Sequence, residues 1–179
     1  MVGANLEQYC DKAILEGATD AKVIHPSSVV TAQWVRAKCL FGCPYKINYT
    51  CPPQTPTPDE TRKILDSYSR AILFHIESSH SKERGKRNMA FLEMLVNLEG
   101  ELFKDGYYKA WVMLAGPCAL CKECGKVTGV ACRFPAKARP SMEACGIDVY
   151  RTARNNGFFI ETLRDKHDTQ NLYCLMLVD

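Results

Sequence analysis

Ten cysteines in a chain of 179 residues constrain this protein more than any other sequence feature. Seven of them fall in two short segments: Cys39, Cys43 and Cys51 in the first, and Cys118, Cys121, Cys124 and Cys132 in the second. In an exported protein an even count would suggest disulfides, but residues 1–16 carry acidic side chains and no long apolar run typical of a secretory signal. Clustered thiols in a reducing cytoplasm more often bind metal. The sequence therefore predicts a cytoplasmic metal-binding protein.

The composition narrows the class of protein further. Hydrophobic residues make up 46% and charged residues 24%, which suits one globular domain over residues 1–179. No apolar run approaches the roughly 18 residues that cross a bilayer, so we expect no membrane partner. A net charge of +3, without basic residues interleaved with aromatics, gives no reason to expect nucleic acid. The composition gives no indication of the oligomeric state.

Apolar periodicity predicts an α/β fold. We expect helices at 5–16, 57–68, 82–104 and 148–155, and strands at 21–24, 29–35, 70–76, 107–115, 158–163 and 172–178. Strands separated by helices favour a layered domain. The prediction is a single domain with a mixed sheet of about four to six strands flanked by helices. Two cysteine-rich cluster-binding loops, 36–58 and 115–146, complete it.

Two of these helices have sharp local signals. Thr57 suits an N-cap, Pro58 suits the first turn, and Glu60 can complete a capping box. In the helix at 82–104, an apolar stripe spaced by four, three and four residues predicts a core-facing side. The stripe consists of Phe91, Leu95, Leu98 and Leu102.

The second cysteine segment carries the strongest chemical signal. Cys118, Cys121 and Cys124 are spaced by three residues each, and Cys132 follows as a fourth thiolate. A triple series of this kind is typical of [4Fe–4S] ligation. Structural zinc more often uses two separated pairs, so zinc is the alternative, followed by redox-active thiols. We predict an iron–sulfur cluster here.

The first cysteine segment supplies three thiols, Cys39, Cys43 and Cys51, and so leaves one coordination position open. Cys145 could fill it, which would give eight ligands for two [4Fe–4S] clusters. Alternatively a substrate, a water or a non-cysteine ligand occupies it, which is how an iron becomes a Lewis acid. Structural zinc or plain thiols are the simpler interpretation.

The assignment of ligands to clusters stays open at this stage. Cys51 could serve the later group and Cys132 the earlier one, as in ferredoxins with exchanged ligands. Cys10 and Cys174 lie in apolar patterns and are expected in the core. Arg36 and Arg133 are the candidates for contact with an anionic cluster. Other nearby basic residues, Lys38 and Lys46 among them, fit a solvated surface.

The chain resembles a known family through motifs spread over most of its length. These are Ala115-Gly-Pro-Cys118-x2-Cys121-x2-Cys124, Cys132-Arg133-x-Pro135, Ala138-Arg-Pro-Ser-Met-Glu-Ala144-Cys145-Gly-Ile-Asp-Val149, Cys39-x3-Cys43-Pro44 and Cys51-Pro52-Pro53. They resemble the cysteine-rich family described as "predicted metal-binding protein". The resemblance implies a cytoplasmic protein of anaerobic bacteria or archaea with a cysteine-bound metal.

Three functions remain in view from the sequence. The first is electron transfer to or from a redox protein partner through one or two [4Fe–4S] clusters. The second is an enzyme that binds and activates a small substrate at an open-coordination iron. The third is a structural zinc or a metal- or cluster-delivery role.

Overall fold

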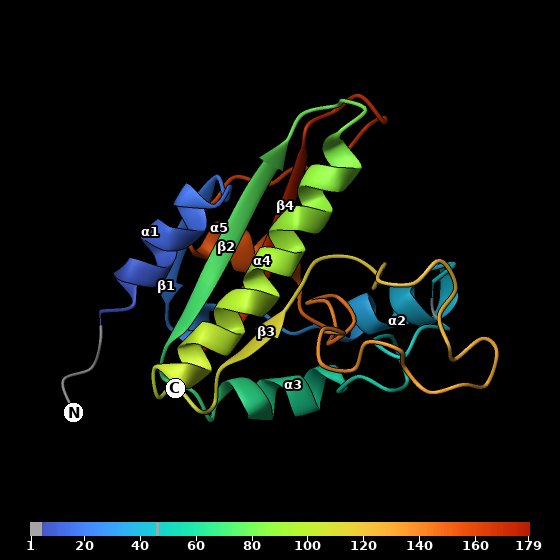
Figure 1. Cartoon of the computed structure of the whole chain (residues 1–179), viewed down its shortest axis with the longest axis horizontal. Helices are drawn as coiled ribbons and strands as arrows, with labels where there is room; N and C mark the ends of the chain where they lie inside the picture. The colour runs from blue at the N-terminus through green and yellow to red at the C-terminus, as the bar shows by residue number, and fades with distance from the viewer. Residues whose placement is uncertain (1–4, 46) are drawn as a thin grey trace.

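The computed structural model describes residues 5–45 and 47–179, so Lys46 lies outside the described residues. The described chain contains a four-stranded sheet, five α-helices and a short 3-10 turn (Figure 1). The elements run in the order α1 (Glu7–Leu15), β1 (Asp20–Ile24), the 3-10 turn (Pro26–Ser28), α2 (Gln33–Phe41), α3 (Pro58–Leu65), β2 (Ala71–Ser78), α4 (Arg84–Lys104), β3 (Trp111–Met113), α5 (Val149–Asn155) and β4 (Gln170–Leu177).

The sheet has the order β1-β2-β4-β3, and each neighbouring pair of these strands is antiparallel. The prediction of a mixed sheet is therefore wrong, although the α/β class and the lower end of the strand count are confirmed. β2 and β3 do run in the same direction and are joined through α4, as a parallel crossover would be. The C-terminal strand β4 inserts between them, so no two parallel strands are neighbours.

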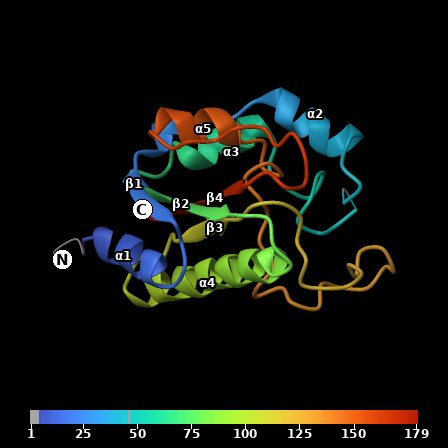
Figure 2. The same cartoon turned by 90° about the horizontal axis from the view of Figure 1, so that it is seen from above.

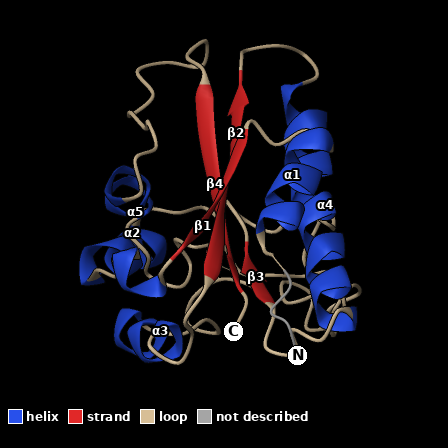
Figure 3. Cartoon of the chain, turned by 90° about the vertical axis from the view of Figure 1, so that its left-hand side faces the viewer, coloured by secondary structure: helices blue, strands red, loops and turns tan. Residues whose placement is uncertain are grey.

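Helices cover both faces of the sheet and make a three-layer domain (Figures 2 and 3). α1 and α4 lie on one face, and α2, α3 and α5 lie on the other. Alternation along β2 divides the core: Ile72 and Phe74 face the first layer, whereas Ala71 and Leu73 face the second. Because both faces are covered, β2 is buried along nearly its whole length.

The helix signals of the sequence are confirmed. The Thr57 hydroxyl accepts the Glu60 backbone N–H, and the Glu60 carboxylate accepts the Thr57 N–H, which completes the capping box of α3. The stripe of α4, from Phe91 to Leu102, is buried against the sheet. Asp148 caps α5 by accepting the Arg151 N–H.

Two predicted strands are wrong and one is shorter than expected. Of the strand predicted at 29–35, residues 29–32 run beside α5, where the Val30 N–H donates to the Thr152 hydroxyl and Thr31 forms only an isolated bridge. Residues 33–35 instead begin α2. Over 158–163 the apolar alternation reflects burial of Phe158 and Ile160 without strand pairing. β3 covers only Trp111–Met113 of the expected 107–115.

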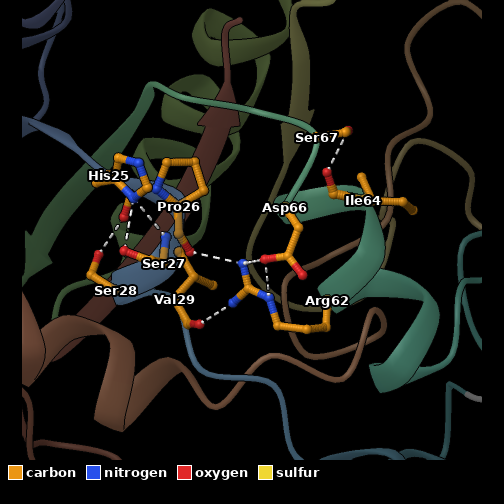
Figure 4. A network of polar contacts seen from close by, with 9 residues as sticks. All are labelled: His25, Pro26, Ser27, Ser28, Val29, Arg62, Ile64, Asp66 and Ser67. Carbon is orange, nitrogen blue, oxygen red and sulfur yellow. Dashed lines mark hydrogen bonds and ion pairs between the residues drawn. The ribbon is translucent and has the colours of Figure 1, made fainter.

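The segment that leads into α2 is anchored on α3 by one arginine (Figure 4). The Arg62 guanidinium donates to the carbonyls of Val29 (2.8 Å) and Pro26 (3.2 Å) and pairs with Asp66. This network fixes where α2, and hence the first cysteine segment, begins. Within the described residues, no helix has the length and apolar character needed to traverse a bilayer.

Candidate metal centre

The two cysteine loops lie side by side at one end of the molecule, beyond β3 and α2 (Figures 1 and 2). We call loops 42–57 and 115–141 together the cysteine end. The second loop is closed at its base, where Leu114 bridges Ser141 and the Met142 N–H donates to the Leu114 carbonyl. The cysteines of this loop therefore lie on a long loop whose two ends are paired with each other at the edge of the core.

The returning part of the second loop is fixed to α4 by charged side chains. Arg139 forms a forked ion pair with the largely buried carboxylate of Glu99, and Glu99 also accepts the Val112 N–H. Lys137 pairs with Glu93 at 2.8 Å. Because bidentate arginine–carboxylate pairs define orientation as well as distance, the base of the loop has a set position.

All four cysteines of the second segment line one cavity of about 320 Å³. The cavity is also lined by Asn48 of the first loop and by Arg133. Burial raises the pKa of the Cys118 thiol; a backbone hydrogen bond at Leu120 opposes this, and the neighbouring thiols of Cys132, Cys121 and Cys124 add to it. The other three thiols are therefore near enough to Cys118 to act on it, and thiols lose their protons when they bind a metal. The four cysteines thus form one candidate donor set.

Hydrogen bonds join the first loop to the second. The Asn48 side-chain amide donates to the Cys118 carbonyl at 3.2 Å, and the Tyr49 hydroxyl donates to the Val130 carbonyl at 3.1 Å. Burial raises the pKa of the Cys51 thiol, and the nearby thiols of Cys43 and Cys118 both raise it further. Cys51 therefore lies between the two groups, and the geometry leaves open which of them it serves.

The first cysteine group borders a second and larger cavity. Cys39 is on the last turn of α2, where no helix was predicted, and Cys43 follows the helix end at Gly42. Both line a cavity of about 950 Å³, which extends past Trp34 and Glu143. Burial raises the pKa of Cys39, and Glu143, Cys43 and Cys51 add to the effect, partly opposed by Arg36.

Arg36, a predicted cluster contact, has a clear structural role. Its buried Nη1 donates to the Thr55 carbonyl and hydroxyl (both 3.0 Å), to the Pro56 carbonyl (2.8 Å) and to the Ala144 carbonyl (3.3 Å). It thus joins α2, the first loop and the segment after the second loop. Its positive charge also acts to lower the pKa of the Cys39 and Cys145 thiols, against the effect of burial. The other predicted contact, Arg133, lines the smaller cavity and donates to the Glu123 carbonyl.

Cys145, the expected eighth ligand, lies in a different environment from the other seven. It is fully buried in the apolar cluster between the sheet and the second helix layer, and burial raises the pKa of its thiol to about 12. It is not among the described side chains that line either cavity. Cys10 and Cys174 are buried in the other apolar cluster, where the sequence placed them.

This donor set agrees with the comparison to protein families. The sequence profile of the family described as "Predicted metal-binding protein (DUF2284)" matches residues 22–178. The chain belongs to this family. The match confirms the resemblance seen in the cysteine motifs, and it supports a metal-binding role without naming the metal. No curated protein and no solved structure matches the chain.

The side chains of this member of the predicted metal-binding family offer mainly sulfur atoms as metal ligands. Within residues 5–45 and 47–179, no three His, Cys, Asp or Glu side chains converge tightly enough to hold a single metal ion. Four soft thiols nevertheless share one cavity wall, which is the donor chemistry that iron–sulfur clusters and zinc both use. The residues of the second group therefore fit a thiolate-bound group, and Cys118, Cys121, Cys124 and Cys132 would hold it.

Sequence reasoning missed one residue of the site, Glu143. Its Oε2 is the one buried side-chain nitrogen or oxygen in the described chain that has no hydrogen-bond partner. Burial raises the pKa of this carboxyl group, against the effect of nearby backbone N–H groups and the Ser141 hydroxyl. An unpaired buried polar group costs about 1–3 kcal/mol. The only sequence signal was its place two residues before Cys145, within the family motif.

Proposed function

We propose that this chain is an iron–sulfur protein that holds a [4Fe–4S] cluster on Cys118, Cys121, Cys124 and Cys132 and acts in electron transfer with a redox protein partner. The observation that carries the proposal is that all four of these cysteines line one cavity of about 320 Å³. When bound, such a cluster supplies one-electron chemistry. A cytoplasmic location and an anaerobic source belong to the same proposal, because these clusters are sensitive to oxygen.

Cluster binding is preferred to a single zinc ion because of the donor pattern. Zinc is held in a tetrahedron with Zn–S distances of about 2.3 Å, usually by two separated pairs of ligands. A triple series with three-residue spacing suits a group several atoms across, with each thiolate on a different iron. The nearby cations of Lys122 and Arg133, which line the same cavity, would stabilise an anionic cluster.

The test is an anaerobic count of iron and acid-labile sulfide with an absorption spectrum. About four of each per chain indicates one cubane and about eight indicates two, whereas stoichiometric zinc without sulfide would overturn the proposal. Cys121→Ser should remove about four iron, and Cys10→Ala, in the apolar core, is the matched control that should keep them. Reversible reduction above the solvent limit tests electron transfer, and its absence removes that part.

A second candidate function is an enzyme that activates a small substrate at an open-coordination iron. The cavity of about 950 Å³ beside Cys39 and Cys43 favours it, because this volume is that of a small-molecule site. Substrate analogues should then perturb the electron paramagnetic resonance spectrum of the reduced protein. An unperturbed spectrum, together with four protein ligands on every cluster iron, would exclude this function.

A further inference from the structure

We infer that Glu143 is a metal ligand of the first cysteine group, where its carboxylate takes the coordination position that Cys39, Cys43 and Cys51 leave open. The inference rests on the proposed function, since it requires that this group also holds an iron–sulfur cluster. It gives Glu143 the role that the sequence suggested for Cys145.

The first observation is the unpartnered oxygen. Glu143 as a residue is partly exposed, but its Oε2 is buried and has no donor among the described residues. Native proteins rarely leave such an acceptor unmet, and an ion, a water or a catalytic role usually accounts for one that is. A cation that binds the carboxylate would satisfy this oxygen directly. Carboxylate oxygens are common ligands of iron and zinc.

The second observation is where the carboxylate lies. Glu143 lines the larger cavity together with Cys39 and Cys43. The Cys39 thiol donates weakly to the Glu143 carbonyl, with 3.7 Å between Sγ and the oxygen. Glu143 thus shares a cavity wall with Cys39 and Cys43, while its Oε2 is itself buried.

The third observation is that the backbone just after Glu143 is held in place by the first loop and by α3. The hydroxyls of Thr55 and Thr61 donate to the carbonyls of Ala144 and Cys145, each at 2.6 Å. Gly146 packs against Pro58 so closely that an added Cβ would lie 2.5 Å from the proline ring. Ligands held by outer hydrogen bonds are typical of built metal sites. The turn that follows Glu143 is therefore fixed, and with it the point from which the Glu143 side chain extends.

The contrast with Cys145 strengthens the assignment. The Cys145 thiol is enclosed by apolar residues such as Met142 and Ile147, all fully buried in the core. To ligate a metal at the cavity it would have to leave that packing. Glu143, in contrast, already lines that cavity. Since a carboxylate is a harder ligand than a thiolate, one iron of this cluster would differ from the other three.

The test isolates the first group. The full chain is produced without oxygen in a Cys121→Ser, Cys124→Ser background, and iron and sulfide are counted. We expect this background to keep about four of each. Glu143→Gln should then reduce both to less than half, Glu143→Asp should restore most of the loss, and the matched control Cys145→Ala should keep all four. The Mössbauer spectrum of ⁵⁷Fe-loaded background protein should show one iron distinct from the rest.

Other outcomes separate the two proposals. An unsubstituted chain without iron overturns the proposed function itself. If the unsubstituted chain holds about four iron and the background none, the proposed function stands and the role of Glu143 is overturned. The role is likewise overturned if Glu143→Gln keeps its iron, if Cys145→Ala alone loses it, or if all four irons are equivalent. Should Glu143→Gln fail to fold by circular dichroism, the Mössbauer spectrum and Glu143→Asp decide.

Discussion

The layered sheet and the cysteine end of this molecule are stabilised by different interactions. On the sheet, two apolar clusters enclose nearly every side chain of β2 and β4. At the cysteine end, the described residues of loops 42–57 and 115–141 form no helix or strand and expose large apolar side chains such as Tyr45 and Phe134. Hydrogen bonds and ion pairs hold these loops in the absence of a core. The comparison teaches that a bound metal would stabilise the cysteine end far more than the sheet.

Metal removal should separate the two regions most strongly. Under the proposed function, chelation of the metal should lower amide exchange protection in both cysteine loops by at least about a hundredfold, since ligand binding there is folding free energy. Amides of β2 and β4 should change little, because their burial involves no metal. Hydrogen exchange with mass spectrometry measures both at once. An equal loss in the sheet would contradict the division.

A core truncation should do the reverse. Leu98 in α4 is 1% exposed, so Leu98→Ala should lower the free energy of unfolding by about 2–5 kcal/mol. The iron content of each folded chain should stay the same. Urea denaturation measures the first and an iron count the second. The exposed Leu15, at 87%, serves as control, and Leu15→Ala should change stability by less than about 0.5 kcal/mol.

Arg36 joins the two regions, so its substitution should affect both. Arg36→Lys keeps the charge but loses most of the four hydrogen bonds to Thr55, Pro56 and Ala144. We expect a loss of about 1–3 kcal/mol in unfolding free energy, because buried carbonyls are left unpaired. Iron should also dissociate faster in the presence of a chelator. Arg164→Lys, at a side chain 88% exposed, should change neither.

The smallest expected effect is at the helix that follows the first loop. Thr57→Ala removes the N-cap of α3 and should cost about 1 kcal/mol of unfolding free energy in urea denaturation. Thr57→Ser keeps a hydroxyl and should restore most of it. Iron content should be unchanged in both variants. A large loss of iron in Thr57→Ala would show that α3 and the first loop are more tightly coupled than the comparison holds.

Local signals predicted the elements that depend on local physics. The capping box at Thr57, the α4 stripe and the cap at Asp148 all have their cause within a few residues, and all are confirmed. The strand predicted at 29–35 failed because residues 29–32 run beside α5 without a partner strand, which has no separate sequence signal, and residues 33–35 begin α2. The helix that carries Cys39 was missed for a related reason: proximity to the proline-rich loop hid a short helix.

In the candidate site too, some residues could be placed from local sequence signals and others could not. The spacing of Cys118, Cys121 and Cys124 was enough to place these thiols together with Cys132, because closely spaced residues on one loop cannot lie far apart. The environments of Cys145 and Glu143 were not predictable. They depend on which side of one turn faces the core, and contacts from Thr55, Thr61 and Pro58 decide that.

The sequence by itself determined the α/β class, most helices, and a cysteine-rich metal-binding chain of its family, since periodicity and spacing act over short distances. Only the tertiary structure decided that β4 separates β2 from β3, so that neighbouring strands are antiparallel. It alone also put the Cys145 thiol into the apolar core and Glu143 on the cavity wall that Cys39 and Cys43 line. The physical reason is shared: both outcomes depend on packing between segments distant in sequence, which no local pattern encodes.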